Sequence, residues 1–213
     1  MQIMFIHLPT ATLITLLAAL SVLVIVMLIV CLVLLQRTRK LHHQCEVERG
    51  TDALTGLWNR TRFMELAERQ VNYVQRTGRS AAVLLIDLDE CKKINHSYGH
   101  VAGDMAVRLI SQAARDTVRD YDLLGRYSGE EIVVLLPDTT LEGAQAVAKR
   151  FREKLGAQKV TTTENKTFGV TVSVGIAALR CETDTLEDML VGADAALVTA
   201  KAQGRDRVVA QGG

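Results

Sequence analysis

The stretch AAVLLIDLDE, residues 81–90, decides the fold: six apolar residues lead directly into the acids Asp87 and Asp89. A short apolar run of this kind is typical of a buried β-strand. Side chains alternate between the two faces of a strand, so acids two positions apart point to the same side. Two such carboxylates form a candidate metal site, and the plainer interpretation is a pair of solvated turn residues.

A second acidic feature is SGEE, residues 128–131, which lies between the predicted strands at 123–127 and 132–136. The pattern predicts a β-hairpin with Gly129 at its tip, where glycine tolerates a positive φ and lets a ligand approach the backbone. Mg²⁺ usually takes one or two carboxylates together with substrate phosphates. If the strands pair, Asp87 and Glu130 supply such a clamp; a solvated acidic turn is the alternative.

Strands and helices alternate along this region. We predict helices near 60–77, 102–117, 141–155 and 186–203, and strands at 81–88, 123–127, 132–136, 169–179 and 207–209. Alternation of this kind indicates a single α/β domain, which we place at 52–213.

The amino-terminal part differs in composition from the rest of the 213 residues. Residues 1–36 contain no Lys, Arg, Asp or Glu, and in the run from Leu13 to Leu35 only the Cys31 thiol is ionisable. At 1.5 Å per residue this run is about 34 Å long, enough to cross a hydrocarbon core of about 30 Å. We therefore predict a membrane-spanning helix at 13–35 after a short extracytoplasmic segment at 1–12, in preference to a buried core helix or a cleaved signal peptide.

Arg37, Arg39 and Lys40 come just after this run, and no Lys or Arg precedes it. The positive-inside rule then predicts a single-pass protein of the inner membrane, with the lipid bilayer as a partner and the carboxyl-terminal domain in the cytoplasm. Residues 36–51 are predicted to form a juxtamembrane linker helix.

Composition also excludes other classes of protein. The formal net charge is +1 with no basic stripe beyond the juxtamembrane cluster, so we expect no nucleic-acid partner. The four cysteines show no C-x-x-C spacing, which supports neither a disulfide framework nor a zinc site.

Five ordered segments resemble motifs of the GGDEF-domain diguanylate cyclases. SGEEI at 128–132 takes the place of the five signature letters, and DALTGLWNR at 52–60 resembles the opening motif. The others are IDLDECKKINHSYGHVAGD at 86–104, VTVSVGIA at 170–177 and ADAALVTAKAQGRDRV at 193–208. The resemblance covers about 52–209 and implies a palm-like nucleotidyl-cyclase α/β fold, with a central, mostly antiparallel sheet flanked by helices.

The resemblance implies that two GTP molecules are joined into cyclic di-GMP, with release of two pyrophosphates, by a homodimer that holds one GTP per subunit. Asp87, Glu130 and the carbonyl oxygen of Leu88 would then ligate Mg²⁺ or Mn²⁺ on the triphosphate. Such a metal neutralises phosphate charge and can lower the pKa of the attacking 3′-hydroxyl. Glu130 or Glu131 is the candidate acceptor of that proton, and the sequence leaves the choice open.

Five positions match substrate-binding residues of the family. Asn95 and Asp104 match the guanine-binding pair, in which an acid accepts from guanine N1–H and N2–H and an amide donates to the acceptor edge. Lys92, Lys201 and Arg205 match phosphate-binding positions, and the i, i+4 spacing of the last two predicts one helical face. Without the motifs, Asn95 would be a loop residue, Asp104 a helix cap and the cations solvated or helix-dipole residues.

RDYD at 119–122 matches the family's inhibitory R-x-x-D sequence, in the family's spacing to the signature. In the family this site binds intercalated product and locks the domains in an unproductive arrangement. Arg119 offers a planar fork to guanine and phosphate, and Asp122 accepts from the base. Arg150 matches a second inhibitory arginine.

The sequence departs from the family at peripheral positions. Ser128 replaces the first signature glycine, Ile132 the final phenylalanine, Cys91 a phenylalanine and Val198 a tyrosine. The polar positions survive, which favours retained catalysis. The departures also motivate an alternative, a catalytically silent GGDEF-like module that binds cyclic di-GMP at the R-x-x-D sequence and signals by contact.

Overall fold

The computed structural model describes residues 20, 23–32, 34, 50–180 and 184–211. The chain divides into two compact units, Met1–Glu48 and Arg49–Gly213. In the first unit, residues 20, 23–32 and 34 are helical and exposed; the rest of the predicted span at 13–35 lies outside the described residues, as do 1–12 and 36–49. Within the described ranges, no helix combines the length and apolar character needed to cross a membrane.

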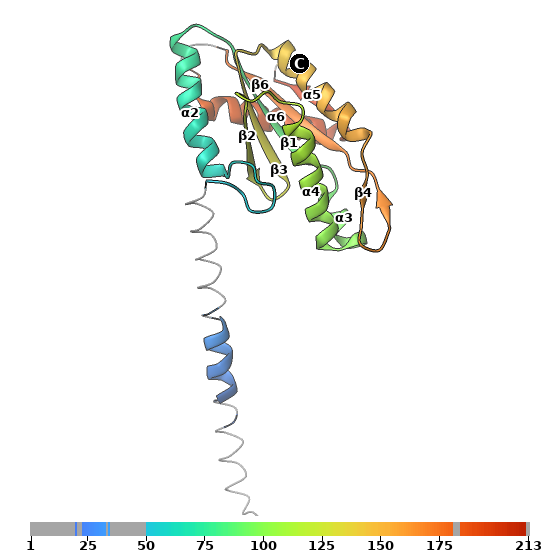
Figure 1. The fold of residues 1–213 in the computed structure, drawn as a ribbon. Helices are drawn as coiled ribbons and strands as arrows, with labels where there is room; N and C mark the ends of the chain where they lie inside the picture. Colours follow the sequence, from blue (N-terminus) through green and yellow to red (C-terminus); the bar gives the residue numbers. More distant parts are fainter. Residues whose placement is uncertain (1–19, 21–22, 33, 35–49, 181–183, 212–213) are drawn as a thin grey trace, which may run out of the picture. The chain divides into compact units, whose positions relative to one another are not determined.

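A five-stranded sheet forms the centre of the second unit, in the order β2-β3-β1-β6-β7 (Figure 1). Its strands are β1 (Ala81–Leu88), β2 (Leu123–Ser128), β3 (Glu131–Pro137), β6 (Val172–Ala178) and β7 (Val208–Ala210). Neighbouring strands are antiparallel except β6 and β7, which are parallel. The predicted central, mostly antiparallel sheet is confirmed, and β1, buried at every position, lies in its middle.

Helices cover both faces of the sheet. They are α2 (Arg60–Arg76), α3 (Cys91–Tyr98), α4 (His100–Arg115), α5 (Leu141–Gly156) and α6 (Leu186–Ala202). In Figure 1, α4 and α5 lie over one face and α2 and α6 over the other. The alternation of β1 divides its side chains accordingly, since Leu84 and Ile86 join the first core and Val83 and Leu85 the second. The sheet is therefore the middle of three layers.

Side-chain caps fix where three helices begin. Asn59, Thr140 and Thr185 precede α2, α5 and α6, and each side chain accepts a hydrogen bond from an N–H of the first turn. Thr185 and Asp188 form a complete capping box. The predicted helix starts near 60, 141 and 186 are confirmed.

The structure differs from the sequence-based prediction in three places. α3 was not expected, and Gly99, with φ of 84°, separates it from α4, which begins at His100. Glycine adopts this φ without steric cost, so the chain can turn sharply between two helices. A small hairpin of β4 (Val160–Thr161) and β5 (Thr167–Phe168) was also missed, and the strand predicted at 169–179 begins only at Val172.

Candidate functional site

Asp87, one residue before the end of β1, carries a nearly buried carboxylate, with 7% of the residue exposed. Lys201, in the last turn of α6, places its Nζ 2.9 Å from Asp87 Oδ2. Burial raises the pKa of Asp87 above its ordinary value; Lys201 lowers it, and the carboxylates of Glu131 and Glu130 raise it further. This end of the strand therefore gathers three acids and one cation.

The hairpin between β2 and β3 brings the two glutamates to Asp87. Asp87 and Glu131 are partner residues in the β1–β3 pair, and the Leu88 N–H donates to the Glu130 carbonyl oxygen at 3.4 Å. Ser128 Oγ donates a hydrogen bond to Glu131 Oε2, which fixes that side chain. Over the described residues, no hydrogen bond or ion pair holds the Glu130 carboxylate, so it is available to a ligand.

The oxygen donors at this position fit a hard divalent cation. Mg²⁺ and Mn²⁺ prefer carboxylate and carbonyl oxygens, which Asp87, Glu130 and Leu88 offer. The like charges that raise the pKa of Asp87 also favour a cation beside it. In the part of the chain that the structure describes, no group of three or more His, Cys, Asp or Glu side chains could hold a metal ion by itself. Phosphate oxygens of a nucleotide and water would complete the octahedral set, so the residues fit a metal that binds together with its substrate.

Asp89 does not join Asp87 as a metal ligand, because its oxygens are already occupied. It is buried, with 5% of the residue exposed, and it accepts hydrogen bonds from Thr171 Oγ1 at 2.8 Å and Ser173 Oγ at 2.6 Å. The backbone N–H of Asp206 also donates to it, at 3.0 Å. Asp89 therefore ties β6 and the α6–β7 connection to the end of β1.

α3 and α4 pack so closely that the Asn95 side chain fills the space beside Gly103. A Cβ atom at Gly103 would lie 2.0 Å from Asn95 Oδ1, so any larger residue there would force the Asn95 side chain to move. Asp104 follows Gly103 and is exposed, as is Lys92 on α3. The two residues predicted to bind guanine, Asn95 and Asp104, thus lie at one helix junction.

The nitrogen and the oxygen of the Asn95 amide differ in their hydrogen bonding. Its Nδ2 donates to Cys91 Sγ at 3.7 Å, whereas Oδ1 is buried and, among the described residues, accepts no hydrogen bond. Burial, followed by the carboxylates of Glu130 and Asp87, raises the pKa of the Cys91 thiol, which keeps it protonated at neutral pH.

The prediction that Lys201 and Arg205 share a helical face is wrong. α6 ends at Ala202, and the backbone at Arg205 has a φ of 61°, outside the helical region. The Arg205 N–H donates to the Ala200 carbonyl oxygen at 3.1 Å, which turns the residue back against the last helical turn. The two cations therefore come from the end of a helix and from the turn after it.

Arg119 and Asp122 line a cavity of about 330 Å³ beside Trp58. Asp122 is buried; its Oδ2 accepts the Arg119 N–H at 2.7 Å, and its Oδ1 has no partner within the described ranges. Burial raises the pKa of Asp122, against the lowering effects of Arg119 and Arg150. Arg150 does not line this cavity, and its Nη2 donates to the Thr117 carbonyl oxygen at 2.7 Å. The structure thus brings Arg119 and Asp122 together and places Arg150 against the preceding backbone.

The family model described as "Diguanylate cyclase, GGDEF domain" matches residues 50–207, a range that contains every site residue described above. The chain belongs to the GGDEF-domain family. Response regulator PleD of Caulobacter vibrioides is 39% identical to this GGDEF domain over 170 residues, which are 79% of this chain and 37% of that protein. Diguanylate cyclase DosC of Escherichia coli is 35% identical over 161 residues, 76% of this chain and 35% of that protein. The chain spans about a third of the length of these relatives.

Solved structures of other GGDEF proteins share the fold. The GGDEF domain of DgcB from Caulobacter crescentus, in complex with c-di-GMP, has a TM-score of 0.75 at 26% identity and covers 78% of this chain and 94% of that one. Diguanylate cyclase SiaD from Pseudomonas aeruginosa, in complex with its activator SiaC, has a TM-score of 0.72 at 30% identity, covering 94% of this chain and 78% of that one. The predicted GGDEF α/β fold, a central sheet flanked by helices, is confirmed.

The sequence prediction missed one contact that supports the GGDEF signature turn. Asp52 accepts hydrogen bonds from the N–H and the hydroxyl of Thr55, at 2.8 and 2.7 Å, and pairs with Arg126 Nη1 at 2.9 Å. Arg126 Nε also donates to the Gly129 carbonyl oxygen at 3.0 Å. The spacing of Asp52 and Thr55 signals a local turn, but only the fold shows that this turn reaches the signature hairpin.

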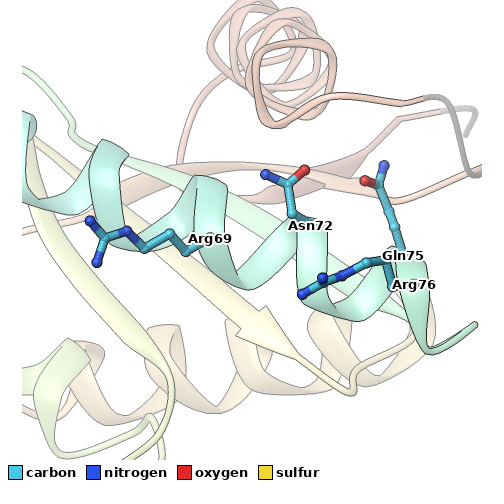
Figure 2. Close-up of a pocket in the computed structure, with 4 residues that line it drawn as sticks. All are labelled: Arg69, Asn72, Gln75 and Arg76. Atoms are coloured by element: carbon cyan, nitrogen blue, oxygen red, sulfur yellow. The ribbon is translucent and has the colours of Figure 1, made fainter.

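A second pocket of the GGDEF domain lies on α2 (Figure 2). It measures about 600 Å³ and is lined by Arg69, Asn72, Gln75 and Arg76. None of the predicted site residues lines it, and Gln75 Nε2 donates to the Asp184 carbonyl oxygen, which ties α2 to the start of α6. We therefore assign this pocket no part in the candidate site.

Proposed function

We propose that this chain is a diguanylate cyclase, which condenses two GTP molecules into cyclic di-GMP and releases two pyrophosphates. The observation that carries the proposal is the convergence of Asp87 and Glu130 at one end of paired strands, beside the Lys201 ammonium. Family membership supports the same reaction, because the relative DosC is named a diguanylate cyclase.

The metal requirement follows from the donor set. Mg²⁺ or Mn²⁺, when bound with GTP, neutralises phosphate charge and lowers the pKa of the attacking 3′-hydroxyl. Asp87, Glu130 and the Leu88 carbonyl oxygen would hold it. Among the described residues the Glu130 carboxylate has no hydrogen-bond or ion-pair partner, whereas Glu131 is fixed by Ser128, so we assign Glu130 to the metal and Glu131 to the hydroxyl proton.

GTP is held at both ends by this chain's own residues. Asn95 and Asp104 bind the guanine, and Lys92, Lys201 and Arg205 bind the triphosphate. Without substrate, Lys201 neutralises Asp87. With a cation held at Asp87, Lys201 would no longer be needed to neutralise that carboxylate and could contact a phosphate oxygen instead.

Joining two GTP molecules requires two half-sites that face each other, so the active form is a homodimer with one GTP per subunit. The membrane-spanning helix at 13–35 would confine these domains to the cytoplasmic side of the inner membrane and raise their effective concentration. No contact with nucleic acid is required.

Cyclic di-GMP binding at Arg119 and Asp122 would add product inhibition. The cavity beside them supports a ligand with N–H donors there, as does Asp122 Oδ1, which has no hydrogen-bond partner among the described residues. The same cavity favours a second candidate function, a cyclic di-GMP receptor without catalysis.

The full chain incubated with GTP and Mg²⁺ tests the proposal, with products identified by mass spectrometry. We expect cyclic di-GMP in the wild type, none with Glu130→Ala or with chelator, and wild-type amounts with Glu153→Ala, whose exposed carboxylate lies 4.0 Å from Lys149. Added cyclic di-GMP should slow the wild type but not Asp122→Ala. Binding of cyclic di-GMP without GTP turnover would select the receptor instead.

A further inference from the structure

The Asn95 amide is held from two sides. Cys91 lies four residues earlier on α3, and its Sγ accepts a hydrogen bond from Nδ2 at 3.7 Å. On the other side Oδ1 is buried against Gly103, where a Cβ would lie at 2.0 Å. In the described structure, one N–H of the amide is therefore hydrogen-bonded to Cys91, the other N–H has no partner, and the oxygen is buried against Gly103.

This arrangement decides which end of the amide can meet a ligand. An asparagine amide offers two N–H donors at nitrogen and two acceptor sites at oxygen. Because Oδ1 is enclosed, the second N–H is the group left for a nucleotide base. If the amide were rotated by 180°, its N–H groups would face the Cα–H of Gly103. A Cα–H is a weak hydrogen-bond donor, so an amide oxygen is more favourable beside it than an N–H.

Resting on the proposed function, we propose that Cys91 is a positioning residue that sets selectivity for guanine by fixing the orientation of the Asn95 amide. In this orientation Asn95 donates an N–H to guanine O6, while Asp104 accepts from N1–H and N2–H. Adenine carries an amino donor in place of O6, so a fixed N–H opposes it. Cys91 acts through Asn95 and contacts no reacting atom.

Binding of unreactive nucleotides to the full chain tests this role. The probes are GTP and ATP analogues with a methylene bridge between the α- and β-phosphates, and the readout is the ratio of their Kd values. We expect Cys91→Ala to raise the Kd of the guanine analogue about fivefold and to leave that of the adenine analogue unchanged or lower, because a released amide no longer opposes the adenine amino group. Cys91→Ser keeps an acceptor and should restore most of the ratio.

Ser97→Ala, at an exposed position of the same helix, is the matched control and should change neither Kd. An unchanged ratio of Kd values in Cys91→Ala overturns the inference. An equal loss of affinity for both analogues also overturns it, because it would indicate general damage to α3. Cys91→Val supplies the same comparison if the alanine variant does not fold. Since the probes cannot react, failure to form cyclic di-GMP from GTP would count against the proposed function alone.

Discussion

Arg126 joins Asp52 to the carbonyl oxygen of Gly129. Its Nη1 lies 2.9 Å from Asp52 Oδ2 and its Nε donates to Gly129 at 3.0 Å. Both charged side chains are largely shielded, with 21% of Arg126 and 14% of Asp52 exposed. One guanidinium therefore holds both the opening segment of the domain and the turn that carries Glu130.

We expect Arg126→Ala to lower the free energy of unfolding by about 2–4 kcal/mol, because Asp52 and the Gly129 carbonyl would both lose a shielded donor. Formation of cyclic di-GMP should fall more than tenfold as the signature turn loosens. Urea unfolding and product assay measure the two effects. Arg79→Ala removes an exposed pair with Asp138 and should cost about 0–1 kcal/mol; equal losses in both variants would contradict the role of Arg126.

Asp52 also predicts a pH dependence. Burial raises its pKa, but the hydrogen bonds from Thr55 and Arg126 outweigh this effect and lower the pKa below its ordinary value. A carboxyl whose pKa is lower in the folded state contributes stability above its unfolded pKa and loses it as the pH falls through its folded pKa. The stability advantage of the wild type over Asp52→Asn should therefore shrink between about pH 5 and pH 2. Urea titrations across this range measure it, and a constant difference would refute the assignment.

Gly103→Ala should displace Asn95, because the added methyl would lie 2.0 Å from Oδ1. We expect at least a tenfold rise in the KM for GTP and a loss of about 1–3 kcal/mol of stability. Gly156→Ala is the control: its Cβ would meet open space at the end of α5, so stability should hold or rise by up to about 1 kcal/mol. An unchanged KM in Gly103→Ala would show that Asn95 does not bind substrate.

Asp87→Asn should abolish activity without destabilising the free protein at neutral pH. Folding raises the pKa of Asp87, chiefly through burial, so stability is lost as the pH rises from the unfolded pKa through the folded pKa. Melting curves should show an equal or higher Tm for the variant. Mg²⁺ with the unreactive GTP analogue should raise the Tm of the wild type and change that of the variant much less; equal shifts would exclude Asp87 as a metal ligand.

Local signals predicted much of the fold. The apolar run of β1, the hairpin around Gly129 and the capping residues Thr140 and Thr185 are short-range patterns, and the structure has elements where they indicate. α3 was not predicted because it has only eight residues and lacks a helix-capping residue. Glu90, which precedes it, has a φ of 55° and makes no side-chain cap hydrogen bond.

Side-chain partners distant in sequence could not be predicted in the same way. Asp87 and Asp89 are both aspartates, two positions apart in the sequence. Asp89 nevertheless accepts hydrogen bonds from Thr171 and Ser173, which lie more than eighty residues later in the chain. The fold alone reveals which acid is structural and which faces Lys201.

The hydrogen bond from Asp206 to Asp89 has a consequence for substrate affinity. Arg205 and Asp206 both adopt left-handed backbone conformations, with φ of 61° and 45°, and Arg152 Nη2 holds Asp206 Oδ1 at 2.7 Å. Ordering a backbone residue costs about 1–2 kcal/mol of conformational entropy. In this loop that cost is met when the domain folds, so the turn carrying Arg205 is preorganised before GTP arrives. If Arg205 binds the triphosphate as proposed, Asp89 and Arg152 set part of that affinity without contacting the nucleotide.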